Sequence, residues 1–597
     1  MYILGVSCYY HDAAAALLRD GVLIAAAEEE RFSRIKHDSG FPRNAIQFCL
    51  DQAGLQGKDL DYVVFYEKPF RKFDRILMTT LQTYPQSWKV FRESMLSWMI
   101  DKLWVGTTLQ TELGVGRDKL LFCEHHLSHA ASAFLCSPFE EAAILTVDGV
   151  GESVTTTCGV GRGNDIRLFQ QIEFPHSLGL LYSAFTAFLG FEVNEGEYKV
   201  MGMAPYGRPR YVDKVWKLVQ QNRDGSFSLD MDYFCFHHST DRTYNQKFVQ
   251  LFGNPRPTKL QFFTKETGFP KYFGAPPGNY NALCELNQHY ADIAASIQKV
   301  TEELLLSMAT HLFHETGLKR LCVAGGVGLN SVANTRILKE TPFEELFVQP
   351  ASGDGGGALG AALWASNSLF GEPRNFTMEH AYWGHSNSDA EINDFLVQNH
   401  IPFQRFENED ELLDRVVERL MSGKVVGWSQ GRFEWGPRAL GSRSILADAR
   451  NPEMKDIVNA KIKFREPYRP FAPSVLAECA ENYFDLSQAQ YHHPARYMLY
   501  VVPVRESQRS VLPAITHVDG TGRLQTVFQN QSPRYYKLIQ RFGQATGVPV
   551  VLNTSFNLKG EPIVNTPANA FSTFSKSEMD NLVLENFLVE KANGVST

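Results

Sequence analysis

Three stretches of the chain share one pattern, in which short apolar strands end in Gly or Asp and lead into helical segments. The first contains the strands YILGVS, AAAALLRDG and VLIAAAEEERF, where Asp20-Gly21 has the composition of a two-residue hairpin turn. The second runs KLLFCEH, SHAASAFLC and AAILTVDG, and the third runs LKRLCVAGGVGLNS, FEELFVQP and SGDGGGALGAALWA. Such strand ends are typical of an α/β domain whose site lies at the strand ends.

The chain is too long, at 597 residues, for one ordinary core and predicts two large domains. The α/β pattern lapses between residues 370 and 387, so we place the first domain at residues 1–370 and the second at 390–597. Residues 208–275 are irregular and rich in aromatic residues. They predict either an insertion over the site or a simple surface excursion. No internal repeat is visible in the sequence.

Composition excludes several classes of function. The net charge of -8 is spread along the chain, so the broad basic face needed to bind nucleic acid or a membrane is not expected. No apolar run reaches the roughly 18 residues of a membrane span, and the first residues lack the basic leader of a signal peptide. The nine cysteines form no C-x-x-C pair, so neither a zinc ribbon nor a disulfide framework is indicated. We expect a cytoplasmic protein.

A candidate metal site rests on four side chains. His125 and His129 stand four apart, so in a helix both imidazoles share one face and can bind one ion. The same spacing also suits a helix cap and a packed core residue. Asp148 ends the strand AAILTVDG, and Asp354 in SGDGGG holds an equivalent position. Two imidazoles and two carboxylates suit iron, our first choice, or manganese or zinc, and do not suit calcium.

Two glycine-rich turns are candidates for phosphate binding. Gly325 and Gly326 lie in AGGVGLNS, and Gly353 and Gly355 lie in SGDGGGALG. Glycines at helix starts let backbone amides approach a phosphate. Neither turn follows the order of a P-loop or of G-x-G-x-x-G, and the same glycines suit ordinary tight turns.

A basic block stands out in the second domain. GRFEWGPRALGSRS and KIKFREPYRPFAP together contain Arg432, Arg438, Arg443, Lys461, Lys463, Arg465 and Arg469. A solvated surface helix would alternate such charges with acids and would lack the Gly and Pro residues found here. Guanidinium groups in rigid loops bind phosphate or carboxylate through two parallel hydrogen bonds. The block predicts a phosphate site, with a structural cluster of salt bridges as the alternative.

The chain resembles the carbamoyltransferase family of nodulation-factor and antibiotic O-carbamoyltransferases, from its first strand to about residue 590. The motifs that carry the resemblance are HHLSHAASAF, LTVDGVGE, EYKVMGMAPYG, AGGVGLNSVANTRI, GDGGGALGAAL, GRFEWGPRALGSRSILADAR, REPYRPFAPSVL and NTSFNLKGEPIV. The resemblance implies an N-terminal α/β domain of the actin and Hsp70 ATPase superfamily, similar to tRNA threonylcarbamoyl transferase. It implies an α+β C-terminal domain similar to the enzyme that makes threonylcarbamoyl-adenylate.

The resemblance also implies roles for individual residues. The metal ligands would be His125, His129, Asp148 and Asp354, the first three with a catalytic role. Carbamoyl phosphate and the Mg complex of ATP would be held by Lys463, Arg438 and Arg469, together with Arg432 and Arg465. Further nucleotide-binding residues would be Lys199, Gly325, Gly326, Asn330, Gly353, Gly355, Asn553 and Ser555. Asn557 belongs to the same motif as the last two.

The activity implied is ATP-dependent O-carbamoyl transfer. The basic domain would form carbamoyl-adenylate from carbamoyl phosphate and ATP, and the other domain would pass the carbamoyl group to a hydroxyl of a natural product or sugar. His126 and His11 are candidates for the general base. A homodimer is possible, and no nucleic acid or membrane partner is expected.

Three other functions are compatible with parts of the pattern. A sugar-kinase-like ATPase or phosphotransferase of the same superfamily needs neither the basic domain nor the histidine pair. A nucleotide-gated binding subunit without chemistry would have lost Lys463 or the histidines. A metalloprotease needs the glutamate of H-E-x-x-H, but His126 stands there.

Overall fold

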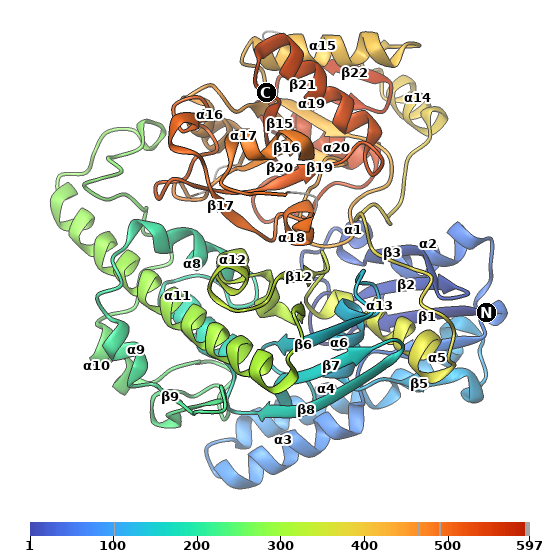
Figure 1. The fold of residues 1–597 in the computed structure, drawn as a ribbon, viewed down its shortest axis with the longest axis vertical. Helices are drawn as coiled ribbons and strands as arrows, with labels where there is room; N and C mark the ends of the chain where they lie inside the picture. The colour runs from blue at the N-terminus through green and yellow to red at the C-terminus, as the bar shows by residue number, and fades with distance from the viewer. Residues whose placement is uncertain (101, 464–465, 489–490, 592–597) are drawn as a thin grey trace. The chain divides into compact units, whose positions relative to one another are not determined.

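The chain forms two compact units (Figure 1). The computed structural model describes residues 1–100, 102–463, 466–488 and 491–591. The first unit comprises Met1–Glu29 and Ser39–Met378, and the second comprises Glu30–Asp38 with the described residues from Glu379 onward. Whether these units coincide with the functional domains drawn at residues 1–370 and 390–597 stays a prediction.

A short segment, Glu30–Asp38, belongs to the second unit although its neighbours on both sides belong to the first. Arg31 is buried and donates a hydrogen bond of 2.7 Å to the carbonyl oxygen of Gly436. Arg34 donates one of 2.6 Å to the carbonyl oxygen of Ile563. The sequence interpretation extended the preceding strand VLIAAAEEERF into this segment as far as Phe32, whereas the strand stops at Glu28 and the two arginines bind carbonyls of the second unit.

A five-stranded sheet opens the first unit, with the strand order β3-β2-β1-β4-β5. Its strands are β1 (Tyr2–Ser7), β2 (Ala14–Arg19), β3 (Val22–Glu28), β4 (Tyr62–Phe65) and β5 (Leu120–Phe122). The first three form an antiparallel meander, and β4 and β5 run parallel to β1. The predicted hairpin turn is confirmed, because Asp20 and Gly21 both have positive φ angles, 52° and 77°, as the favoured two-residue turn requires.

A second five-stranded sheet of the first unit repeats this plan, with the order β12-β11-β6-β7-β8. Its strands are β6 (Glu141–Val147), β7 (Val154–Arg162), β8 (Asp165–Glu173), β11 (Arg320–Ala324) and β12 (Glu345–Val348). Again three strands form a meander and two run parallel to the first of them. The predicted α/β class is confirmed, and the unit contains an internal structural repeat that the sequence did not reveal.

Two helices at corresponding places in the repeat pack closely together. α6 (His125–Phe134) follows β5, and α13 (Asp354–Leu363) follows β12. A Cβ atom added at Gly360 of α13 would lie 1.8 Å from the carbonyl oxygen of Ser128 on α6. Gly360 of GDGGGALGAAL therefore serves helix packing, a role that the sequence analysis did not consider for this motif.

The variant Gly360→Ala tests this packing. We expect it to lower the free energy of unfolding by about 2 kcal/mol, because the added methyl group must push the two helices apart. Alanine has the higher helix propensity, so a loss of stability can only come from the contact. Urea unfolding measures the effect. Gly278→Ala is the control, because a Cβ there meets nothing within 4 Å. Equal stability of the two variants would contradict the close contact.

The other helices of the first unit connect and cover the two sheets (Figure 1). They are α2 (Arg43–Ala53), α3 (Pro69–Thr83), α4 (Trp88–Ile100), α5 (Val105–Leu113), α7 (Leu178–Phe188), α8 (Glu197–Met203), α11 (Tyr280–Thr316) and α12 (Ser331–Glu340). None of the helices in the described part of the chain is long and apolar enough to cross a membrane.

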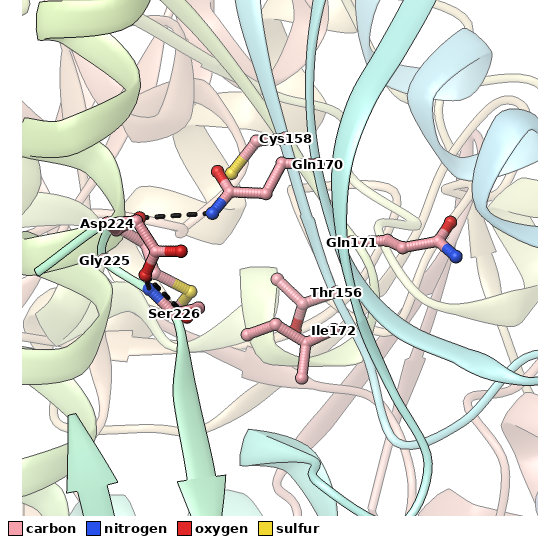
Figure 2. Close-up of a pocket in the computed structure, with 9 residues that line it drawn as sticks. Thr156, Cys158, Gln170, Gln171, Ile172, Asp224, Gly225 and Ser226 are labelled. Atoms are coloured by element: carbon pink, nitrogen blue, oxygen red, sulfur yellow. Dashed lines mark hydrogen bonds between the residues drawn. The ribbon is translucent and has the colours of Figure 1, made fainter. Parts of the chain in front are cut away.

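The irregular segment 208–275 contains some structure of its own. Its elements are α9 (Val212–Trp216), β9 (Val219–Gln221), β10 (Phe227–Leu229) and α10 (Gln246–Phe252). Phe248 of α10 packs against Phe185 of α7, with ring centroids 4.9 Å apart. Gln170 of β8 donates to the carbonyl oxygen of Asp224 in the hairpin (Figure 2). The recess beside that contact has about 10 Å³ of space, room for about one water molecule.

The second unit is built on one mixed sheet, with the order β13-β22-β21-β14-β15-β20-β16-β19. Its strands are β13 (Gln404–Arg405), β14 (Val426–Ser429), β15 (Arg443–Asp448), β16 (Ala472–Leu476), β19 (Gln525–Val527), β20 (Val550–Ser555), β21 (Asn581–Leu584) and β22 (Phe587–Glu590). A small separate sheet pairs β17 (Val501–Pro503) with β18 (Thr521–Arg523). Parallel and antiparallel pairs occur together, as expected of an α+β unit.

Helices α15 and α19 supply much of the core of the second unit, around the buried Trp428 of β14. The helices of this unit are α1 (Glu30–Ser33), α14 (Asp389–Gln398), α15 (Glu409–Met421), α16 (Met454–Val458), α17 (Ala480–Tyr483), α18 (His493–Arg496), α19 (Pro533–Thr546) and α20 (Pro567–Ser575). The apolar faces of α15 and α19 pack on the sheet.

Candidate functional site

The structure brings the four predicted metal ligands together in the first unit. α6 carries His125 and His129 one turn apart, Asp148 follows β6 directly, and Asp354 is the first residue of α13. His125 Nε2 lies 3.3 Å from Asp148 Oδ2 and 3.1 Å from His129 Nε2. His129 Nε2 lies 3.4 Å from Asp354 Oδ1. One donor atom of each side chain therefore faces a common centre.

The surroundings of this four-residue cluster fit a divalent cation. All four side chains are buried, and together they form a group able to hold a metal ion. Nδ1 of both histidines and Oδ2 of Asp354 have no hydrogen-bond partner in the described part of the chain. Two buried carboxylates need positive charge close by, and nitrogen with oxygen donors suits iron, manganese or zinc.

The carboxylates also shift the titration of the cluster. Burial disfavours the charged form of His129, but hydrogen bonds to Asp148 and Asp354 outweigh burial and raise the pKa of His129 to about 9. Burial likewise opposes ionisation of Asp148, yet hydrogen bonds from His125 and His129 hold the pKa of Asp148 well below its usual value. The cluster therefore favours bound positive charge, and a metal ion that binds there displaces protons.

The loop after β6 is fixed around Asp148. Oδ1 of Asp148 accepts a hydrogen bond of 2.8 Å from the backbone N–H of Gly326. The carboxylate of Glu152 accepts one of 2.9 Å from the backbone N–H of His125, the first residue of α6. A carboxylate at a helix start satisfies exposed N–H groups and the helix dipole. Glu152 was not among the predicted site residues, and its place in LTVDGVGE was the only signal for it.

The predicted glycines lie beside the cluster. Gly325 has a φ of 92°, and a Cβ there would lie 2.2 Å from the carbonyl oxygen of Val147, so only glycine fits. Gly353 precedes α13, and Gly355 lies in its first turn. Gly326 makes the hydrogen bond to Asp148. These glycines thus hold Asp148 and shape two turns of the chain, while nucleotide binding by them stays a prediction.

Asn330 and Lys199 have visible structural contacts. The side chain of Asn330 accepts a hydrogen bond from the backbone N–H of Ala333, which caps α12, and its amide pairs with that of Gln298 at 3.1 Å in both directions. Lys199 lies on α8 with its ammonium 5.9 Å from the ring of Phe191. Their part in nucleotide binding stays a prediction.

The two candidate general bases, His126 and His11, differ in their surroundings. Both ring nitrogens of His126 are engaged, with Thr146 at 2.6 Å and with the carbonyl oxygen of Val154 at 2.9 Å, and burial holds its pKa well below the usual value. His11 lies 2.7 Å from Asp12. Burial disfavours its charged form, but hydrogen bonding to Asp12 outweighs this and raises the pKa of His11 to about 9. His11 is therefore protonated at neutral pH.

The basic block gathers at one edge of the second-unit sheet. The registers place the end of β14, the start of β15, the end of β20 and the start of β16 at the same edge. Arg432 and Arg438 lie in the loop between β14 and β15, Lys463 and Arg469 lie before β16, and Ser555 ends β20. Segments that are distant in the sequence therefore present their polar side chains at one edge.

Lys463 is held in a pocket of oxygen atoms. Its ammonium is buried and lies 3.0 Å from the carbonyl oxygen and 2.9 Å from Oδ1 of Asn557. It also lies 3.3 Å from Oγ of Ser555 and contacts the carbonyl oxygen of Ser555. The motif NTSFN thus fixes the position of this lysine, while phosphate binding by it stays a prediction.

The other predicted cations of the block differ in their surroundings. Arg432 donates a hydrogen bond of 2.8 Å to the carbonyl oxygen of Gly384, and Arg469 pairs with Glu466 at 3.3 Å. Arg438 is half-buried in its loop. Arg465 lies outside the described residues.

The backbone that carries Arg438 is fixed by buried groups. Oε1 of the fully buried Glu434 accepts hydrogen bonds of 2.7, 2.8 and 3.1 Å from the backbone N–H groups of Leu440, Ser442 and Arg443. Asn553 donates to the carbonyl oxygen of Ala439 at 3.2 Å. Sequence reasoning missed Glu434, because an acid between aromatic residues gives no sign that it caps a loop from inside the core.

A cavity of about 490 Å³ lies at the same sheet edge, beside the start of α19. Its wall includes His380, Tyr382, Trp383, Arg432, Arg534 and Glu585. Arg534 is neutralised by Glu409 at 3.0 Å and by Glu585 at 3.3 Å. Arg432, one of the cations predicted to bind phosphate, thus also lines this cavity.

Comparisons with known proteins give matches that together cover most of the chain. Residues 2–363 match the sequence model described as carbamoyltransferase N-terminus, and residues 417–591 match the one described as carbamoyltransferase C-terminus. Nodulation protein NolNO of Sinorhizobium fredii is 39% identical, over 98% of this chain and 79% of its own length. The 3'-hydroxymethylcephem-O-carbamoyltransferase of Amycolatopsis lactamdurans is 32% identical, over 54% of this chain and 59% of its own length. Among solved structures, HypF of T. kodakarensis aligns with a TM-score of 0.30 at 13% identity, over 62% of this chain and 48% of its own.

Proposed function

The chain belongs to the carbamoyltransferase family, and we propose that it is an ATP-dependent O-carbamoyltransferase that works through carbamoyl-adenylate. In the proposed first step, carbamoyl phosphate and ATP react in the second unit to give carbamoyl-adenylate and release pyrophosphate. In the second step, the carbamoyl group passes to a hydroxyl of a small-molecule acceptor in the first unit. The acceptor would be a natural product or a sugar.

One observation carries the proposal for the second unit: the buried Lys463 and the arginines of the basic block meet at one sheet edge. Polyphosphates carry several negative charges, and arginines in rigid loops stabilise charge that develops on transferred groups. A sugar-kinase-like phosphotransferase, the alternative function, would not need this cluster of cations in the second unit. The internal repeat of the first unit is compatible with both functions and does not separate them.

The four-residue cluster supports transfer in the first unit. A divalent ion bound by His125, His129, Asp148 and Asp354 would polarise the carbamoyl carbonyl group as a Lewis acid. Glu152 and Gly326 would keep two of the ligands in place, since both bind them directly. Iron is our first choice for the ion, with manganese and zinc as alternatives.

Incubation with ATP and carbamoyl phosphate, without any acceptor, tests the order of the two steps. We expect the purified enzyme to release pyrophosphate, because the first step needs only the ligands of the second unit. Ion chromatography of the products measures this. Omission of carbamoyl phosphate is the control and should stop the release. Formation of ADP and orthophosphate in place of pyrophosphate would favour the kinase-like alternative.

A further inference from the structure

Four cations stand at the beginning of α3, namely Lys68, Arg71, Lys72 and Arg75. Glu124 lies 3.0 Å from both Lys68 and Arg71. Glu67 lies 2.8 Å from Lys72, and both members of that pair are almost completely buried. Three of the four cations are therefore paired with two carboxylates, and Lys68 and Arg71 share Glu124.

Arg75 differs from the other three. In the described part of the chain, no carboxylate lies within 4.0 Å of its guanidinium, which donates one hydrogen bond of 3.2 Å to the carbonyl oxygen of Gly151. The guanidinium is half-buried and lies 5.1 Å from the ring centroid of Phe174. Withdrawal of a cation from water costs free energy unless an anion or several acceptors compensate. Arg75 thus makes no direct ion pair in the described part of the chain, although the charges of Glu67 and Glu152 act on it from further away.

Arg75 lies next to the four-residue cluster. Gly151 belongs to the loop that begins with Asp148, and a Cβ at Gly151 would lie 2.7 Å from Cδ2 of His125. The peptide group that accepts the hydrogen bond from Arg75 is therefore packed on a ligand of the cluster.

The corresponding loop of the internal repeat joins β1 to β2 and carries Tyr10. Tyr10 as a whole residue is 37% exposed, and the centroid of its ring lies 4.4 Å from the ammonium of Lys72. Burial raises the pKa of its hydroxyl, and the negative charges of Asp354 and Asp148 raise it further. The two equivalent loops thus bring Tyr10 and Arg75 to the neighbourhood of the same cluster, where solvent still reaches the tyrosine.

We propose that Arg75 binds the phosphate group of the adenylate while its carbamoyl group is transferred at the cluster. The inference rests on the proposed function. In the transfer, the acceptor oxygen forms a bond to the carbamoyl carbon, and the bond from that carbon to the phosphate oxygen breaks. The electron pair stays on the phosphate oxygen, and the hydroxyl proton ends on the released AMP. The guanidinium stabilises the negative charge that develops on the departing phosphate.

The variants Arg75→Gln and Arg71→Gln form a matched pair for the test. Both remove one positive charge from the same helix, but Arg71 already pairs with Glu124. We expect Arg75→Gln to lower kcat/KM for transfer at least tenfold, with metal content and pyrophosphate release unchanged. Arg71→Gln should leave all three quantities within twofold of the wild type. Arg75→Lys should restore part of the transfer rate, since it restores the charge.

Equilibrium dialysis with labelled AMP gives a readout that does not need turnover. The wild type should show two classes of AMP site, and Arg75→Gln should lose the one in the first unit. Unchanged transfer and AMP binding in Arg75→Gln would overturn the inference. Loss of metal or of thermal stability in that variant would overturn it too, because Arg75 would then support the loop. If the wild type releases no pyrophosphate, the proposed function fails, and the dialysis result still decides whether Arg75 holds a phosphate.

Discussion

Replacement of His129 by alanine is expected to remove the bound metal and to lower carbamoyl transfer at least a thousandfold, about 4 kcal/mol of transition-state stabilisation. His129 Nε2 lies 3.1 Å from His125 Nε2 and 3.4 Å from Asp354 Oδ1, so its loss removes one of four converging donors. Pyrophosphate release should continue, because the ligands of the first step lie in the second unit. Metal analysis and the two half-reactions measure these effects.

His126→Gln is the control for that variant. His126 is adjacent in sequence and equally buried, but its ring nitrogens bind Thr146 and the carbonyl oxygen of Val154 rather than the cluster. We expect the control to lose stability and to keep its metal. If His129→Ala keeps both metal and transfer, the four-residue cluster is not the transfer site.

Arg438→Lys should lower carbamoyl-adenylate formation about a hundredfold, or about 2.7 kcal/mol, while the melting temperature hardly changes. A guanidinium binds phosphate through two parallel hydrogen bonds, and an ammonium with the same charge cannot reproduce that geometry. The loop itself should survive, because Glu434 and Asn553 hold its backbone from inside the core. Pyrophosphate release and thermal unfolding are measured on the same preparation.

Arg443→Lys, in the same basic block, should instead lower the stability of the protein. Arg443 is fully buried and donates hydrogen bonds to the carbonyl oxygens of Gln430, Gly431 and His385. Loss of these bonds should lower the melting temperature by several degrees, since about 1 kcal/mol shifts it by about 2–4 °C in a domain of this size. A destabilised but fully active Arg438→Lys enzyme would contradict the assignment of Arg438 to a phosphate site.

The sequence predicted those features that depend on local chemistry. Asp20-Gly21 forms the expected turn because few dipeptides tolerate two positive φ angles. His125 and His129 share a helix face because their spacing matches the helical period, and Asp148 follows its strand as the apolar run indicated. The structure brings these side chains together, while the roles assigned to them stay predictions.

Features that depend on distant partners could not be predicted in the same way. Glu434 has the composition of a surface acid, and only the fold shows that three backbone N–H groups surround it. Gly360 belongs to a glycine-rich motif that suggests ligand binding, but its lack of a side chain is needed by Ser128 on another helix. Arg75 lies in an aromatic-rich segment whose local pattern says nothing about which charges are neutralised.

The segment Glu30–Asp38 has a consequence for the time course of synthesis. Arg31 and its partner Gly436 are 405 residues apart. At a translation rate of about 5–20 residues per second, Gly436 is synthesised about 20–80 seconds after Arg31. During this time β1 to β3 can pair on the ribosome. The segment Glu30–Asp38, which follows them, cannot yet pack, because the rest of the second unit has not been synthesised. The second unit can reach its final core only when a stretch made near the beginning of translation is still available to enter it.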